Sequence, residues 1–173
     1  MAWNRRLMTG ILSAVVMIGS SFTVAQAANP SYDDTYTNIT YTGTWQAVTG
    51  VIGAVNQTLH WSNVTGSEAS FSCPAGGSGA YGVAFYLTAS KAYNRGIANV
   101  WFTSPFYPGE IRGLTKVDLF EPGVTRQVRI PISTDMPLGT GSPYTIHVQV
   151  SGEKNISSSG TFVDIDSYEC DLS

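Results

Sequence analysis

After residue 30, apolar and polar residues alternate over short segments, and clusters of Gly, Pro, Asn and Ser separate one segment from the next. Alternation with a period of two is typical of β-strands, and no segment keeps the 3.6-residue period of an amphipathic helix. The pattern predicts about nine strands: Asn38–Gln46, Thr58–Asn63, Ala69–Cys73, Gly82–Thr88, Ile97–Phe102, Thr115–Phe120, Thr125–Ile132, Tyr144–Val150 and Thr161–Glu169. We therefore expect an all-β fold in which two antiparallel sheets pack as a β-sandwich.

The parity of a strand indicates which of its side chains face the core. In 144–150 the apolar residues share one face, so we expect His147 on the solvent face. In 97–102 the residues at 98, 100 and 102 form the inward set, so Trp101 faces outward. The two predicted strands therefore each present one aromatic or heteroaromatic ring to the outside.

Two strands carry irregularities that can be predicted from their residues. Val128, Ile130 and Ile132 face the core, and Pro131 between them cannot donate to a ladder, which predicts a sheet edge or a bulge. In the last strand Ile165 and Tyr168 have opposite parity although both should be inside, which predicts a bulge between them. We expect loops at Pro74–Ala80, Ser104–Gly113 and Thr134–Pro143.

The first 27 residues have the organisation of a secretory signal peptide. Arg5 and Arg6 precede the apolar stretch Leu7–Val24, and the small-x-small site Ala25-Gln26-Ala27 follows. A retained membrane anchor is the alternative, but glycines and serines interrupt the stretch. Cleavage leaves a single domain at 28–173 with no later apolar segment that could span a bilayer. We therefore expect a secreted protein, extracellular or at the cell surface.

Two cysteines, Cys73 and Cys170, lie in the exported part. In an oxidising compartment such a pair predicts a disulfide, and two free buried thiols are the alternative. Neither His60 nor His147 has the spacing to these cysteines that a zinc site requires.

Charge is sparse, at 12% of residues against about 25% in an average soluble domain. The formal net charge is −3, and loss of the two leader arginines makes it more negative, so the chain lacks the electrostatic footprint of a nucleic-acid-binding protein.

Four N-x-S/T sequons are glycosylation acceptors if the source glycosylates secreted proteins, and chance triplets otherwise: Asn38, Asn56, Asn63 and Asn155.

Seven segments, in order, carry a family resemblance: 39–45 (ITYTGTW), 58–62 (TLHWS), 66–71 (GSEASF), 91–98 (KAYNRGIA), 117–120 (VDLF), 150–155 (VSGEKN) and 158–166 (SSGTFVDID). Together they resemble secreted jelly-roll modules of the galactose-binding-like type, which occur as non-catalytic carbohydrate-binding-module-like domains on extracellular enzymes and cell-surface proteins. The resemblance implies a jelly-roll sandwich and spans nearly all of the exported chain. The chain departs from it at Thr103–Gly113 and Thr134–Pro143, where longer segments would reshape or cover the family's binding surface.

Sugar recognition needs an aromatic platform and a few polar groups around it. Trp101 with Tyr93, Asn94 and Arg95 is one candidate set, and Asp118 or Asp164 would accept hydrogen bonds from sugar hydroxyls. The alternative is that Trp101 packs under the loop that follows it.

The charged residues of the resembling segments also allow structural roles. Arg95 and Asp164 would form an internal ion pair rather than contact a ligand. Related jelly rolls hold a structural calcium, and the resemblance implies Asp166 with Asp34 or Asp33 as its ligands. A solvated acidic strand end is the alternative to calcium, and no cofactor is required.

Catalysis has little support, because no G-x-S-x-G elbow is present and nothing in the sequence brings a nucleophile to His60 or His147, or pairs Asp118, Glu121 and Asp164. The sequence therefore predicts a secreted, non-catalytic module that binds an extracellular glycan or cell-surface polymer. The alternatives are a structural or adhesive surface protein that binds proteins or its own copies, and, less favoured, an esterase or other hydrolase.

Overall fold

The computed structural model describes residues 31–73, 83–105, 107–136 and 144–172 of the 173-residue chain. The predicted signal peptide, the Pro74–Ala80 loop and most of the Thr134–Pro143 loop lie outside these residues. Within them the chain forms twelve strands and one short 3-10 helix, η1 (Val55–Gln57). Among the described residues, no helix is long and apolar enough to cross a membrane.

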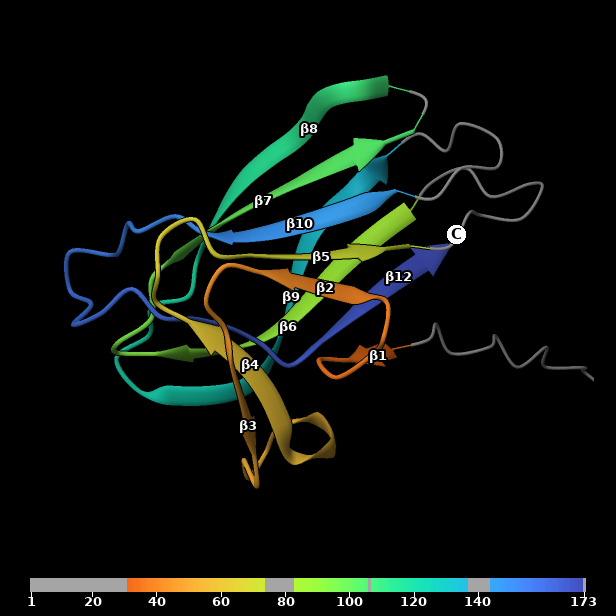
Figure 1. Cartoon of the computed structure of the whole chain (residues 1–173). Helices are drawn as coiled ribbons and strands as arrows, with labels where there is room; N and C mark the ends of the chain where they lie inside the picture. Colours follow the sequence, from red (N-terminus) through yellow and green to blue (C-terminus); the bar gives the residue numbers. More distant parts are fainter. Residues whose placement is uncertain (1–30, 74–82, 106, 137–143, 173) are drawn as a thin grey trace, which may run out of the picture.

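The strands form three antiparallel sheets (Figure 1). The four-stranded sheet has the order β1 (Ser31–Asp33), β12 (Ser167–Leu172), β6 (Val83–Ala92) and β9 (Val124–Met136). The five-stranded sheet has the order β2 (Ile39–Thr42), β5 (Glu68–Ser72), β10 (Thr145–Val150), β7 (Ile97–Ser104) and β8 (Tyr107–Asp118). The three-stranded sheet has the order β11 (Val163–Ile165), β4 (Thr58–Ser62) and β3 (Gln46–Thr49).

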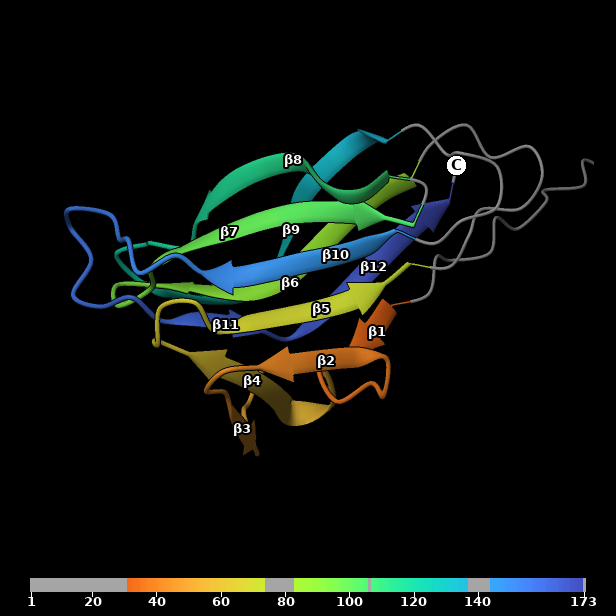
Figure 2. The same ribbon diagram turned by 45° about the horizontal axis from the view of Figure 1, so that its top comes forward.

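The two larger sheets pack on each other as the layers of a sandwich, with the five-stranded sheet in front in Figure 2. Aromatic residues from both layers meet between them: the rings of Phe71 and Tyr168 stack at 4.1 Å, and those of Phe85 and Phe102 meet edge to face at 6.0 Å. All four are essentially inaccessible to solvent. The predicted all-β sandwich is therefore confirmed, with its core between the inward faces of the strands.

The disulfide joins the two layers. Cys73 follows β5 of one sheet, Cys170 lies in β12 of the other, and their sulfurs are bonded across a Cα–Cα distance of 5.8 Å. Both residues are buried and belong to the same core cluster as the aromatic residues. The predicted pairing is confirmed, and the alternative of two free thiols is wrong.

Strand parity is confirmed where the strands are regular. Side chains of β7 and β10 alternate between partly and fully buried, so Trp101 and His147 lie on the outer face. Pro131 lies in β9, an edge strand of its sheet, and pairs with Tyr86 beside a register shift. The predicted edge or bulge at the proline is therefore confirmed, because the strand is an edge strand and its register shifts nearby.

The boundaries of two predicted loops are wrong. The segment predicted as the loop Ser104–Gly113 is mostly strand, because β8 starts at Tyr107 and pairs with β7. Residues 134–136 likewise belong to β9 rather than to the loop. Cross-strand pairing with an existing neighbour extends both strands beyond the point where the alternation of the sequence ends.

Two predicted single strands are each divided between sheets. The segment Asn38–Gln46 breaks at Gly43, whose φ is +80°, so β2 joins the five-stranded sheet and β3 the three-stranded one. The bulge predicted between Ile165 and Tyr168 is a break at Asp166, where the chain leaves β4 and pairs with β6 instead. This change of sheet reverses the parity, which explains how Ile165 and Tyr168 are both buried.

Candidate functional site

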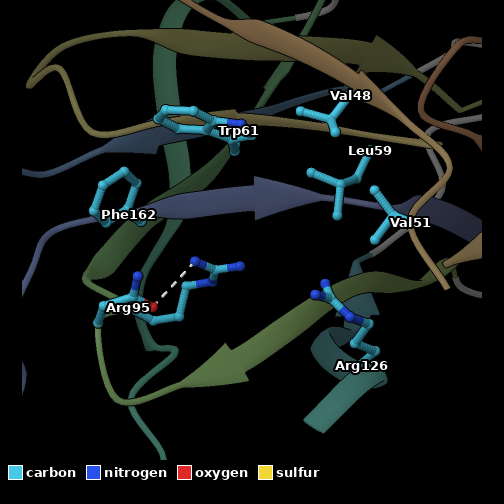
Figure 3. A pocket seen from close by; sticks show the side chains of 8 residues that line it. Val48, Val51, Leu59, Trp61, Arg95, Arg126 and Phe162 are labelled. Carbon is cyan, nitrogen blue, oxygen red and sulfur yellow. Dashed lines mark hydrogen bonds between the residues drawn. The ribbon is translucent and has the colours of Figure 1, made fainter. Parts of the chain in front are cut away.

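A pocket of about 270 Å³ opens where the three-stranded sheet faces the β6–β7 turn and the start of β9 (Figure 3). Apolar side chains line one side of the pocket, and amide and guanidinium groups line the other. The lining residues are Val48, Val51, Leu59, Trp61, Asn94, Arg95, Arg126 and Phe162. The pocket therefore combines aromatic rings with hydrogen-bond donors, all of which come from four separate parts of the chain.

The aromatic wall follows from alternation along β4. Leu59 and Trp61 are two residues apart and point to the same side of the strand, so both face the pocket. Phe162 precedes β11, which pairs with β4, and its ring lies 5.1 Å from that of Trp61 at an angle of 57°. Both rings are only partly buried, so their surfaces are available to a ligand.

Arg95 lies on the turn between β6 and β7 and is fixed by a buried ion pair. Its Nη2 donates to Asp164 Oδ2 at 3.0 Å, and the other carboxylate oxygen accepts the Ser90 N–H at 3.0 Å. The Asp164 side chain has no exposed surface, and that of Arg95 is 13% exposed. The internal pair is therefore present, and Asp164 is placed to orient Arg95 rather than to meet a ligand.

A glycine brings this turn against the segment that carries Phe162. The N–H of Gly96 donates to Phe162 O at 2.9 Å, and a Cβ at Gly96 would lie 2.7 Å from the Thr161 Cα. Only a residue without a side chain permits this approach. The close contact positions Arg95 and Phe162 on the same pocket.

Arg126 reaches the pocket from a β-bulge in β9. Between the pairs Ala89–Val128 and Lys91–Thr125, β9 contains one residue more than β6, and Gln127 has a φ of +53°. A bulge of this kind redirects the neighbouring side chain. The Arg126 side chain then extends across Gly53, within 3.5 Å of where a Cβ there would lie, toward the space beneath Leu59 (Figure 3).

The structure does not bring all of the predicted ligand residues together. Asn94 and Arg95 line the pocket, while Tyr93 beside them is 54% exposed and is not part of the lining. Trp101 lies four residues beyond the start of β7, about 13 Å along the strand, on the outer face of the five-stranded sheet. Asp118 ends β8, where it accepts hydrogen bonds from the Phe120 N–H and Asn155 Nδ2.

The Trp101 ring packs against a cluster of polar side chains on the outer face of its own sheet. Its ring stacks on His147 with centroids 5.1 Å apart and an angle of 3°. His147 Nδ1 lies 2.7 Å from Glu68 Oε1, and its Nε2 lies 2.9 Å from Thr103 Oγ1. His147 is on the outer face as predicted, but its side chain is only 17% exposed because these neighbours cover it.

This carboxylate, imidazole and hydroxyl have the order of a hydrolase triad. They lie on central strands, where the backbone N–H groups belong to the ladders of β10 with β5 and β7. Acyl transfer needs free donors that stabilise an oxyanion next to the nucleophile. In the described part of the chain, the N–H groups that belong to these ladders are engaged by neighbouring strands and do not supply such donors.

A second buried polar cluster contains the residues predicted to bind calcium. The Asp34 N–H donates to Asp166 O at 2.9 Å, which brings the two residues together. The Asp34 carboxylate accepts from Thr58 Oγ1 at 2.5 Å and lies 2.7 Å from His60 Nδ1. Asp166 Oδ1 accepts the Val55 N–H at 2.7 Å. Asp34, Asp164 and Asp166 are all buried, so the alternative of a solvated acidic strand end is wrong.

Burial shapes the acidity of this cluster. Desolvation raises the pKa of Asp166 to about 6, and the charges of neighbouring aspartates act in the same direction while the Val55 N–H opposes it. Desolvation also raises the pKa of Asp34, against the hydrogen bonds from Thr58 and His60. Both carboxyls are therefore held closer to their neutral forms than exposed aspartates are.

The donor set does not match a calcium site. Calcium takes six to eight oxygen ligands, whereas both Asp34 oxygens already face Thr58 and His60. Within the described ranges, no three His, Cys, Asp or Glu side chains gather so as to hold a metal ion. We therefore assign no role to a metal here.

The sequence did not single out the two aromatic residues of the pocket, Trp61 and Phe162, or its second arginine, Arg126. Trp61 shares the inward parity of Leu59, and Phe162 lies in the segment 158–166 that carries the family resemblance. Arg126 has no such signal, because only the bulge at Gln127 turns it toward the pocket. The three come from distant parts of the chain, and their proximity depends on the pairing of β11 with β4 and of β9 with β6.

The fold is similar to several solved structures. A Paenibacillus xanthan lyase matches with a TM-score of 0.60 and 18% identity over 83% of this chain and 13% of that chain. The CBM36-1 domain of a multidomain xylanase from the hindgut metagenome of Trinervitermes trinervoides matches with a TM-score of 0.50 and 16% identity over 84% and 98%. The Podospora anserina GH26-CBM35 β-(1,4)-mannanase matches with a TM-score of 0.51 and 14% identity over 83% and 27%.

These likenesses concern the fold. The chain spans about an eighth of the xanthan lyase and nearly all of the CBM36 domain. No family model and no curated protein sequence matches it. The chain therefore has the jelly-roll fold of carbohydrate-binding modules, in agreement with the family resemblance of its segments.

Proposed function

We propose that this chain is a secreted, non-catalytic carbohydrate-binding module that holds a glycan in the pocket beside β4. The observation that carries the proposal is the meeting of Trp61 and Phe162 with Asn94, Arg95 and Arg126 around one cavity. A sugar offers an apolar C–H face to an aromatic ring and hydroxyls to amide and guanidinium groups. The lining of this pocket provides both kinds of partner.

The size of the pocket favours a short ligand. Its volume of about 270 Å³ lies just below the range of roughly 300–1,000 Å³ found for sites that hold drug-sized molecules. We infer that it binds one sugar ring, as a terminal residue or a side branch. A long polymer would need contacts beyond the pocket.

The fold and the sequence support the rest of the proposal. The CBM36 domain shows that this architecture occurs as a carbohydrate-binding module, and this chain covers 98% of that domain. Secretion is supported by the leader-like residues 1–27 and by the disulfide between Cys73 and Cys170, which suits an oxidising compartment.

The test is a glycan array followed by fluorescence titration of the purified protein. Trp61→Ala should weaken binding of the best array ligand at least tenfold, because it removes the platform of the pocket. Trp101→Ala is the matched variant, a tryptophan on the outer face of the five-stranded sheet. Loss of binding in Trp101→Ala alone would assign the glycan to that face, and absence of any array signal would contradict the proposal.

Self-association is a second candidate function, favoured by one strand. β8 is an edge strand of twelve residues, and Ile111 and Leu114 on it are each 63% exposed. A long edge with apolar side chains can pair with another strand. Light scattering over a range of concentrations tests this, with the Ile111→Lys variant as the comparison. A mass that stays that of the monomer in both the wild-type protein and the variant would exclude association through β8.

A further inference from the structure

The pocket contains more positive charge than its neighbours neutralise. Two guanidinium groups line it, those of Arg95 and Arg126. Asp164 pairs with Arg95 at 3.0 Å, but Arg126 forms no ion pair with any residue in the described part of the chain. Its hydrogen bond is a long one, from Nη1 to Ser90 Oγ at 3.4 Å. One full positive charge is therefore left over at this cavity, in a protein whose net charge is negative.

Arg95 has unused hydrogen-bonding capacity as well. Its Nη1 donates to Asn94 Oδ1 and its Nη2 to Asp164, while its Nε is buried and has no acceptor among the described residues. A buried donor without an acceptor costs free energy. The arginine side of the pocket is thus short of acceptors as well as of negative charge.

The aromatic wall argues against an inorganic anion as the ligand that pairs with the positive charge of Arg126. Trp61 and Phe162 face the same cavity as Arg126, and a small ion would leave their ring surfaces without a partner. A ligand that satisfies both sides has an apolar face for the rings and an anionic group for the guanidinium. A sugar with a carboxylate or sulfate meets this description, because an arginine fork binds such groups through two parallel hydrogen bonds.

We infer that the sugar held in this pocket is anionic and that Arg126 binds its charged group. The inference rests on the proposed function and specifies its ligand class. Arg126 is well suited to this role because the bulge at Gln127 directs it inward from an edge strand, where its side chain remains solvent-accessible in the free protein. Neutral sugars would use the same aromatic wall but would leave the charge of Arg126 unmatched.

The test compares D-glucuronic acid, D-glucose 6-sulfate and D-glucose in calorimetric titrations of the purified protein. At least one anionic sugar should bind tenfold or more tightly than glucose, and the tighter of the two identifies the anion. Arg126→Gln should abolish this preference, because the affinity for the anionic sugar should fall at least tenfold, to about the level of glucose. Arg126→Lys, which keeps the charge without the fork, should retain part of the preference.

Arg129→Gln is the matched control, since it removes the same charge from the same strand. Arg129 lies over the ring of Tyr86 and pairs with Glu169, outside the pocket lining, so the preference should survive in this variant. Raising the salt concentration from about 50 to 500 mM should weaken binding of the anionic sugar and leave glucose unaffected. Equal affinities for all three sugars in the wild-type protein would overturn the inference and leave the proposed function intact. If no sugar binds, and array binding is also absent, the proposed function fails with it.

Discussion

Arg95 and Asp164, 69 positions apart in the sequence, form a buried ion pair of 3.0 Å that connects the β6–β7 turn to β11. The same carboxylate also accepts the Ser90 N–H from β6. The pair thus ties the four-stranded sheet to the three-stranded sheet at the wall of the pocket. A defect here should affect both the stability of the fold and the shape of the binding site.

We expect Asp164→Ala to lower the free energy of unfolding by about 3–5 kcal/mol, the usual cost of leaving one member of a buried pair uncompensated. Urea denaturation followed by fluorescence measures the effect. Glu153→Ala is the control, because it breaks the exposed pair with Lys116 and should cost less than about 1 kcal/mol. Equal losses in the free energy of unfolding for the two substitutions would show that the buried pair stabilises the protein no more than the exposed pair does.

Gly96→Ala should reduce stability by about 1–3 kcal/mol, because the added methyl group would overlap the Thr161 backbone. Glycan affinity should fall as well, since relief of the overlap moves Arg95 away from Phe162. Gly123→Ala is the matched control: a Cβ at Gly123 meets nothing within 4 Å, and we expect a change within about 0.5 kcal/mol. Unfolding curves measure the stability of both variants. Equal stability of the two, together with normal glycan affinity in Gly96→Ala, would argue against the close contact.

The disulfide should contribute about 4 kcal/mol, because it closes a loop with a sequence separation of 97 residues and so restricts the unfolded chain. Thermal unfolding with and without a reductant measures this contribution. The double variant Cys73→Ser with Cys170→Ser should melt at the lower temperature and show no response to the reductant. A melting temperature of the wild-type protein that is insensitive to complete reduction contradicts the prediction.

Asp166 should make the protein less stable as the pH rises from about 4 to 7. Its pKa in the folded state is about 6, above the value of 3.8 for an unperturbed aspartate, so the folded protein holds this proton more tightly than the unfolded chain does. The stabilisation is complete below about pH 4 and is lost as the pH passes through about 6.

Asp166→Asn removes this titration while keeping a carbonyl oxygen for the Val55 N–H. We therefore expect the variant to be more stable than the wild type by about 1–3 kcal/mol at pH 7.5 and similar to it at pH 4. Denaturant unfolding at both pH values measures the difference. The converse pattern, a gain at pH 4 only, would contradict the raised pKa.

The sequence alone was sufficient for the elements whose residues carry their own signal. Period-two alternation located β4, β5, β7 and β10 within a few residues, because in a sandwich one face of each strand must be buried wherever it pairs. The inward sets of β7 and β10 followed from the same burial, and the cysteine pair followed from the presence of two cysteines in a chain expected to be exported. The proposed extracellular location rests first on the leader-like residues 1–27 of the sequence, and the disulfide of the structure adds support.

Tertiary structure decided what depends on contacts between distant segments. Three features depend on which strands are neighbours: the break at Asp166, the extension of β8 from Tyr107 and the bulge that turns Arg126 toward the pocket. Local alternation of apolar and polar residues does not indicate which strands will pair. For the same reason the sequence placed a tryptophan platform at Trp101, whereas the cavity forms at Trp61. A pocket is made by side chains from several strands at once, so its position is a property of strand pairing and not of any one segment.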